Sequence, residues 1–166
     1  PNYVSVVTAS KREAAKNMLK QSLFQNLGYN KFPTELEELI NKKGEDSYIA
    51  VVHIDGNGVG NRFKNLNTLE EIQNLSISLD TAIKNSFNEI CKLIQNKKEF
   101  SGDSKVLPIR PIIIGGDDIT FVTRGELGIY LAKNFIDSYV KQPSSDNVKN
   151  SACAGVAIVN VKYPFY

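Results

Sequence analysis

The sequence predicts an α+β fold in which strands and helices follow the order β-α-β-β-α-β from residue 48 onward. Three observations support this order: a β-branched run at residues 48–54, apolar residues at helical spacing across 72–94, and two short apolar runs that flank Gly115-Gly116. This is the ferredoxin-like arrangement, a mostly antiparallel sheet with helices on one face. It places the first strand and one strand of the hairpin side by side in the middle of the sheet.

The chain divides into a short helical segment or linker at residues 1–47 and a domain at residues 48–166. In the first segment Ser10 and Glu13 have the spacing of a capping box, and Gly28 is a suitable residue for the end of the helix. No catalytic constellation is present there, so we expect this segment to pack or to link.

The long helix of the domain is expected to begin at a second capping box, formed by Thr68 and Glu71. A polar loop should follow at residues 96–105. Pro108 and Pro111 come next, and proline is tolerated in a strand only near a sheet edge or a strand start. The second strand is therefore expected to lie near a sheet edge or to carry these prolines near its start.

In the last third of the domain the sequence pattern predicts one helix, one loop and one strand. Apolar residues recur at helical spacing between residues 127 and 140, and residues 142–150 indicate a surface loop. The final strand is expected at residues 152–161, broken at Gly155 because glycine weakens a strand interior.

Composition narrows the functional class. The 166-residue chain has a net charge of +2, too near neutral to indicate a nucleic-acid-binding face from charge alone. It has no apolar run long enough to span a membrane, so we expect a cytoplasmic protein with no membrane partner. Cys91 and Cys153 lack the spacing of a metal site and are expected to be buried, reduced thiols, and His53 is expected to pack inside its strand.

The hairpin at residues 111–122 carries the first candidate site. Gly115-Gly116 should form its turn, with Asp117 and Asp118 at the tip. Two adjacent carboxylates repel each other, and a divalent cation would remove that cost. The competing interpretation is a solvated turn with no ligand.

A second strand also ends in an aspartate, Asp55, followed by a glycine-rich loop at residues 56–60. If this strand pairs beside the hairpin, three carboxylates converge in an arrangement that suits two Mg²⁺ ions and a substrate phosphate. Glycines let backbone N–H groups approach a polyphosphate, and Arg62 and Lys64 could add positive charge. The loop matches neither the Walker pattern nor the dinucleotide fingerprint.

These motifs together resemble one known family. The run from Tyr48 to Asn57, the Gly115-Gly116-Asp117-Asp118 turn, and residues 151–158 ahead of Tyr163-Pro164-Phe165 are similar to the second palm domain of the large subunit of type III CRISPR effector complexes. That domain belongs to the wider palm superfamily of nucleotidyl cyclases, GGDEF diguanylate cyclases and polymerases. The resemblance covers residues 48–166.

The resemblance implies an RNA-activated synthase that joins ATP into cyclic oligoadenylates for antiviral defence, in company with other effector subunits and guide or target RNA. It implies that two Mg²⁺ or Mn²⁺ ions activate the attacking ribose hydroxyl and stabilise the leaving pyrophosphate. The metal-binding and catalytic residues would be Asp55, Asp117 and Asp118. The nucleotide-binding residues would be Gly56, Asn57, Gly58, Val59, Gly60, Gly115, Gly116 and Ser151. For Asn57 and Ser151 a purely structural role, in a turn and at a strand start, is weighed equally.

Two departures keep alternatives open. Asp118-Ile119 stands where a diguanylate cyclase carries Glu-Phe, which argues against cyclic-di-GMP synthesis. The family fold continues with more helix after Pro164, so we expect a piece truncated at its C-terminus that binds nucleotide and is inactive alone. The alternatives are another nucleotide cyclase or polymerase palm, and a non-catalytic palm that scaffolds nucleotide or RNA.

Overall fold

The computed structural model describes residue 10 and residues 32–33, 35–40, 47–101 and 106–162. Ser10 is helical, and the rest of the helix expected between Ser10 and Gly28 lies outside the described residues. In chain order the elements are η2 (Leu36–Leu39), β1 (Tyr48–Gly56), α2 (Val59–Lys64), α3 (Leu69–Asn96), α4 (Lys98–Ser101), β2 (Ile109–Gly115), β3 (Asp118–Arg124), η3 (Gly125–Leu127), α5 (Gly128–Tyr139) and β4 (Ala152–Asn160).

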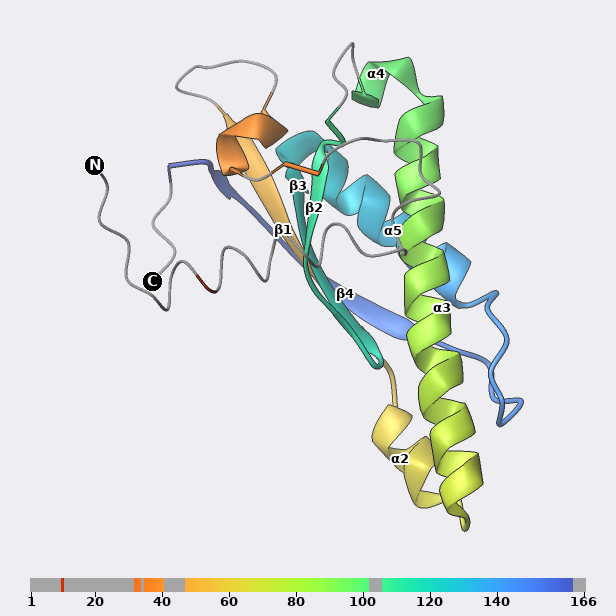
Figure 1. The fold of residues 1–166 in the computed structure, drawn as a ribbon. Helices are drawn as coiled ribbons and strands as arrows, with labels where there is room; N and C mark the ends of the chain where they lie inside the picture. Colours follow the sequence, from red (N-terminus) through yellow and green to blue (C-terminus); the bar gives the residue numbers. More distant parts are fainter. Residues whose placement is uncertain (1–9, 11–31, 34, 41–46, 102–105, 163–166) are drawn as a thin grey trace.

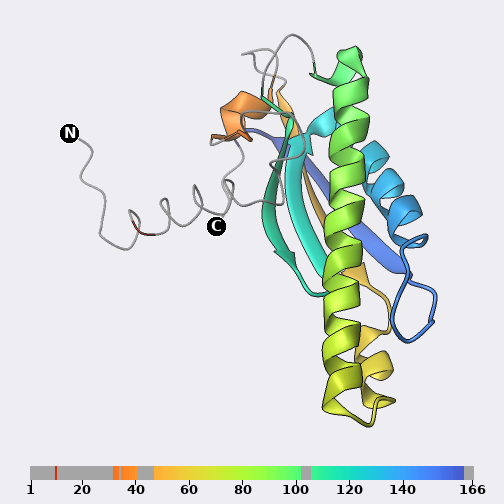
Figure 2. The same ribbon diagram turned by 45° about the vertical axis from the view of Figure 1, so that its right-hand side comes forward.

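The four strands form one sheet in the order β2-β3-β1-β4, and each neighbouring pair is antiparallel. Helices α3 and α5 lie on the same side of this sheet, as Figures 1 and 2 show. This confirms the predicted α+β, ferredoxin-like fold. Strand β1 is central and touches both β3 and β4, so its C-terminal end is placed between the β2–β3 turn and the start of β4.

The core lies between the sheet and the two helices. Strand residues contribute by alternation, because Ala50, Val52 and Ile54 all point to the helical side and are fully buried. Helix α3 starts at the predicted capping box of Thr68 and Glu71. Its buried apolar residues follow the predicted helical spacing, whereas Ile72 is exposed; the buried set includes Leu75, Leu79, Ile83, Phe87, Ile90 and Ile94.

Several local predictions were wrong. Strand β4 is not broken at Gly155, which pairs with His53 in an uninterrupted ladder, because a glycine costs a strand entropy without removing its hydrogen bonds. The polar segment after α3 contains the short helix α4. Cys91 is buried as expected, but Cys153 is exposed because it pairs with Asp55 and shares its exposed face of the sheet.

Strand β2 is the other edge strand, with Pro108 just before it and Pro111 near its start, as expected for prolines, and its pairing with β3 shifts between Pro111 and Ile113. None of the helices within the described ranges has the length and hydropathy that a membrane span requires.

Candidate functional site

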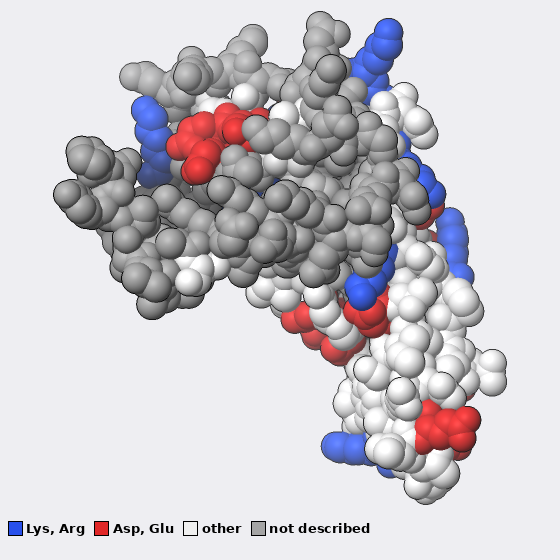
Figure 3. All heavy atoms as spheres, in the orientation of Figure 1, with Lys and Arg blue, Asp and Glu red and all other residues white. Residues whose placement is uncertain are grey.

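The β1–β3 ladder brings the predicted carboxylates to one end of the sheet. Asp55 is the register partner of Asp118, and Asp117 lies in the turn that joins β2 to β3. The backbone N–H of Gly56 donates to the Asp117 carbonyl at 3.0 Å, which joins the end of β1 to that turn. Figure 3 shows acidic side chains gathered at this end of the sheet.

The turn itself lies one residue later than the sequence predicted. Gly115 still pairs with Asp118 as a strand residue, so Gly116 and Asp117 are the two central residues of the turn. Gly116 has φ of +59°, and Asp117 is not among the described residues with positive φ. This is the pattern of a type II′ hairpin turn, which requires glycine at the first central position.

The carboxylates of Asp55, Asp117 and Asp118 lack partners among the described side chains. Asp55 is exposed and Asp117 and Asp118 are half-buried, and within the described residues none of the three makes a side-chain hydrogen bond or ion pair. Like charges directly opposite each other in a ladder are destabilising. The structure therefore places three acidic residues near this end of the sheet without a counter-charge among the described side chains.

The donor set fits a hard divalent cation, since Mg²⁺ keeps several waters and needs only one or two carboxylates. Within the described ranges, however, no three His, Cys, Asp or Glu side chains are gathered closely enough to hold a metal ion. The backbone thus sets the carboxylates side by side without forming a closed ligand cage.

The glycine-rich loop fits closely against the hairpin turn. A Cβ at Gly56 would lie 3.0 Å from Cγ2 of Val59 and 3.2 Å from both Cβ and the carbonyl oxygen of Asp117. Gly58 precedes α2 with φ of +69°, and Gly60 lies in the first turn of that helix. The Val59 side chain is buried in a small apolar cluster, so it does not face a ligand.

On its other side the loop meets the start of β4. The Asn57 N–H donates to the carbonyl of Ser151 at 2.8 Å. The two residues predicted to contact a base or ribose are therefore neighbours, although 94 positions of sequence numbering separate 57 from 151. The structure brings together Asp55, Gly56, Asn57, Asp117, Asp118 and Ser151.

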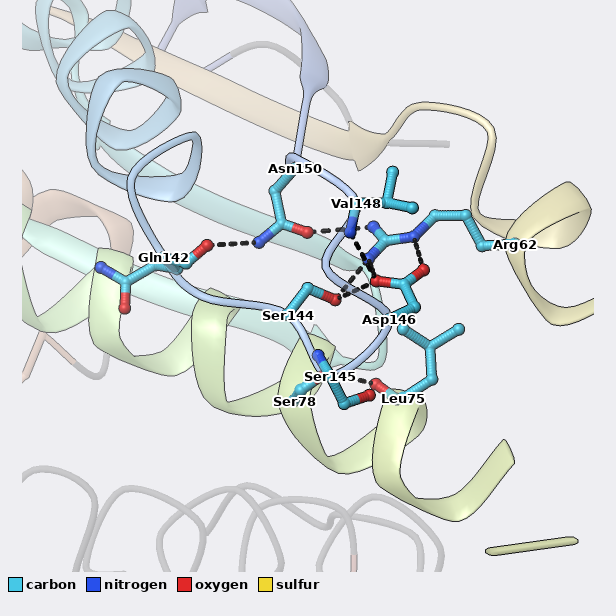
Figure 4. A network of polar contacts seen from close by, with 9 residues as sticks. All are labelled: Arg62, Leu75, Ser78, Gln142, Ser144, Ser145, Asp146, Val148 and Asn150. Atoms are coloured by element: carbon cyan, nitrogen blue, oxygen red, sulfur yellow. Dashed lines mark hydrogen bonds and ion pairs between the residues drawn. The ribbon is translucent and has the colours of Figure 1, made fainter. Parts of the chain in front are cut away.

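Arg62 does not provide the free positive charge that the sequence suggested. Its Nε donates to Oδ2 of Asp146 at 2.8 Å, Nη2 donates to Oδ1 of Asp146 at 2.7 Å, and Nη1 donates to Oδ1 of Asn150 at 3.0 Å. Figure 4 shows this guanidinium surrounded by the loop that precedes β4. The hydrogen bonds from Arg62 hold the pKa of the Asp146 carboxyl well below its usual range, so the pair stays charged.

Tyr139, at the end of α5, interacts electrostatically with Arg62 and with the carboxylates of Asp117 and Asp55. Burial raises the pKa of its hydroxyl, the Arg62 charge opposes that rise, and Asp117 and Asp55 add to it. The hydroxyl is buried and finds no hydrogen-bond partner among the described residues. The phenol is consequently neutral beneath the site.

Sequence reasoning missed one further residue. His53 is exposed on the open face of the sheet, and its Nδ1 is hydrogen-bonded to Oγ1 of Thr120 at 2.9 Å. The prediction that it packs inside the strand was wrong. Strand alternation could have found it, because residues two apart share a face and His53 therefore shares that of Asp55.

Comparison with known proteins gives a family match and matches to solved structures. The family model for Cas10/Cmr2, second palm domain, matches residues 48–166. The crystal structure of an apo Csm1-Csm4 cassette is similar in fold, with 18% sequence identity, a TM-score of 0.54, and coverage of 70% of this chain and 17% of that chain. No curated protein matches the sequence.

The structural likeness, at that identity, concerns the fold alone, and it spans a small part of the Csm1-Csm4 chain. The family match extends from the first residue of β1 through β4. It includes all the candidate site residues at this end of the sheet: Asp55, Gly56, Asn57, Asp117, Asp118 and Ser151. The chain therefore belongs to the Cas10/Cmr2 second palm domain family.

Proposed function

We propose that this domain serves a metal-dependent nucleotidyltransferase that binds ATP and forms 3′–5′ phosphodiester bonds, with cyclic oligoadenylates as the product. The observation that carries the proposal is the strand register, which sets Asp55 opposite Asp118 with Asp117 in the adjoining turn. Unpaired carboxylates beside a glycine-rich loop are the donors that Mg²⁺ or Mn²⁺ and a polyphosphate use together.

Each part of the site would have its own task. Asp55, Asp117 and Asp118 would hold two divalent ions. Those ions, when bound, would supply activation of the attacking hydroxyl and stabilisation of the leaving pyrophosphate. The glycine loop would let backbone N–H groups approach the triphosphate, with Gly115 and Gly116 shaping the opposite wall. Asn57 and Ser151, joined through their backbones, would meet the base or ribose.

We also propose that the protein acts in the cytoplasm with other subunits of a type III CRISPR effector and with its guide and target RNA. Family membership supports this, as does similarity in fold to a chain solved as a Csm1-Csm4 cassette.

The competing candidate is a palm retained as a scaffold, and one observation favours it. No ready metal cage exists among the described side chains, so a ligand would have to draw the carboxylates together.

Calorimetric titration of ATP into the full-length protein, with and without Mg²⁺, separates the two candidates. We expect Mg²⁺-dependent ATP binding, and we expect the Asp117→Asn variant to weaken it by more than about 10-fold. Even the loss of a group that only hydrogen-bonds to a metal ligand typically lowers metal affinity by about that factor. Asp137→Asn is the matched control, because this carboxylate pairs with Lys133 on the exposed side of α5.

Unchanged ATP affinity in Asp117→Asn would reject the metal-site proposal in favour of the scaffold. Tighter binding of GTP or cyclic-di-GMP than of ATP would instead reassign the palm to another nucleotide.

A further inference from the structure

The side chain of Arg62 points into the loop of residues 140–151, between α5 and β4. Three of its partners, Ser144, Asp146 and Asn150, all lie on that loop. Only 9% of the Arg62 side chain and 11% of the Asp146 side chain are exposed. A forked, largely dehydrated pair of this kind fixes both partners in one geometry.

The loop is itself held in place around this pair. Oγ of Ser144 donates to Oδ1 of Asp146 at 2.8 Å, and the Val148 N–H reaches the same oxygen at 3.2 Å. Nδ2 of Asn150 donates to the Gln142 carbonyl at 3.0 Å. Both carboxylate oxygens of Asp146 therefore accept hydrogen bonds, and the contacts within the loop hold it around the guanidinium.

The Arg62–Asp146 pair provides a second connection between the glycine-rich loop region and the start of β4. One connection is the hydrogen bond from the Asn57 N–H to the Ser151 carbonyl, at 2.8 Å. The other is the hydrogen bond from Arg62 to Asn150, the residue just before Ser151. Between the two connections run α2 and the second half of the glycine loop. The loop and the start of β4 are therefore held at two points and cannot separate unless the Arg62 contacts break.

We propose that Arg62 is a positioning residue: its ion pair with Asp146 is a clamp that holds the glycine-rich loop against Ser151, in the arrangement that receives the nucleotide. This rests on the proposed nucleotide-binding function and assigns Arg62 a role other than phosphate ligand. The alternative is that Arg62 leaves Asp146 to bind the triphosphate directly.

The two roles predict opposite results for Asp146→Asn. A phosphate-binding arginine is freed by this change, so ATP affinity should hold or improve. A clamp is weakened by it, so ATP affinity should fall. Arg62→Lys separates them again, because lysine keeps the charge but cannot form the fork.

We would measure Mg²⁺-ATP affinity in the full-length protein for Asp146→Asn, Arg62→Gln, Arg62→Lys and the Asp146→Asn/Arg62→Gln double variant. The clamp predicts losses of about 10-fold in each single variant and no larger loss in the double variant, because both changes break one interaction. Retained affinity in Asp146→Asn or Arg62→Lys, or additive losses in the double variant, would overturn it.

Two controls separate positioning from general destabilisation. Asp80→Asn removes a carboxylate from an ion pair with Lys84 on α3 and should leave affinity unchanged. Ile109→Ala opens the core at the opposite end of the sheet and lowers stability without touching the clamp. At a temperature where all variants are folded, a fall in affinity in Ile109→Ala equal to that in Asp146→Asn would reject the positioning role.

Hydrogen exchange keeps the clamp testable if the wild-type protein does not bind ATP. The clamp predicts faster exchange of the backbone amides of residues 56–61 in Asp146→Asn and unchanged exchange in Asp80→Asn. Absent ATP binding with faster exchange would reject the proposed function and keep the clamp, whereas unchanged exchange would reject the clamp itself.

Discussion

The end of β1 lies between two charged regions that are built in opposite ways. On one side, the β2–β3 turn places like charges together, with Asp55 facing Asp118 and no counter-charge among the described residues. On the other side, Arg62 and Asp146 form a complete, nearly buried ion pair. The comparison indicates that this domain pairs charges where a shape must be kept and leaves them unpaired where a ligand is expected.

The largest loss of folding stability should come from breaking the Arg62–Asp146 ion pair. Arg62→Met leaves the Asp146 carboxylate mostly buried without its counter-ion, and breaking such a pair costs about 3 kcal/mol. Urea denaturation followed by circular dichroism would measure the loss. A free energy of unfolding equal to that of the wild type would show that the pair does not stabilise the fold.

Low pH should reduce the stability that the Arg62–Asp146 ion pair contributes. Because Arg62 lowers the pKa of Asp146 in the folded protein, its stabilisation is fully present above the ordinary aspartate pKa of about 3.9 and is lost as pH falls below it. Between pH 6 and pH 3 the wild type should therefore lose more stability than Asp146→Asn. Parallel pH profiles of the two proteins would contradict the assignment.

The smallest effect, and one of opposite sign, is expected at the turn. In metal-free buffer Asp118→Asn should stabilise the domain by about 0.5 kcal/mol, because it removes a like charge from the ladder position opposite Asp55. Adding Mg²⁺ should raise the melting temperature of the wild type and leave that of the variant unchanged. A destabilised variant in EDTA would mean that Asp118 has a structural partner after all.

Much of the fold followed from local patterns. Alternation in β1, the capping box of Thr68 and the helical spacing of α3 are all encoded within a few neighbouring residues. The approach of Asp55 to the hairpin needed one further step, the ferredoxin-like strand order, which places the first strand beside a hairpin strand. That order predicted Asp117 as the neighbour of Asp55, and the register shows that Asp118 is its direct partner.

The missed features depend on information that short segments do not contain. Arg62 and Asp146 are 84 positions apart, and nothing near either residue marks the other as its partner. Two adjacent glycines could not be told apart until Gly116 was seen to adopt positive φ. The exposure of His53 was recoverable in principle, since it follows from counting two residues back from Asp55.

The central position of β1 has a consequence for how the protein is made. This strand is complete at residue 56, whereas β3 begins at residue 118 and β4 at residue 152. At a synthesis rate of about 10 residues per second, β1 leaves the ribosome roughly ten seconds before its last partner strand begins to form. The turn that holds Asp117 and the loop that receives Arg62 also lie in the later half of the chain. Binding competence should therefore arise in a single late step, when β4 joins the sheet and completes both sides of the site at once.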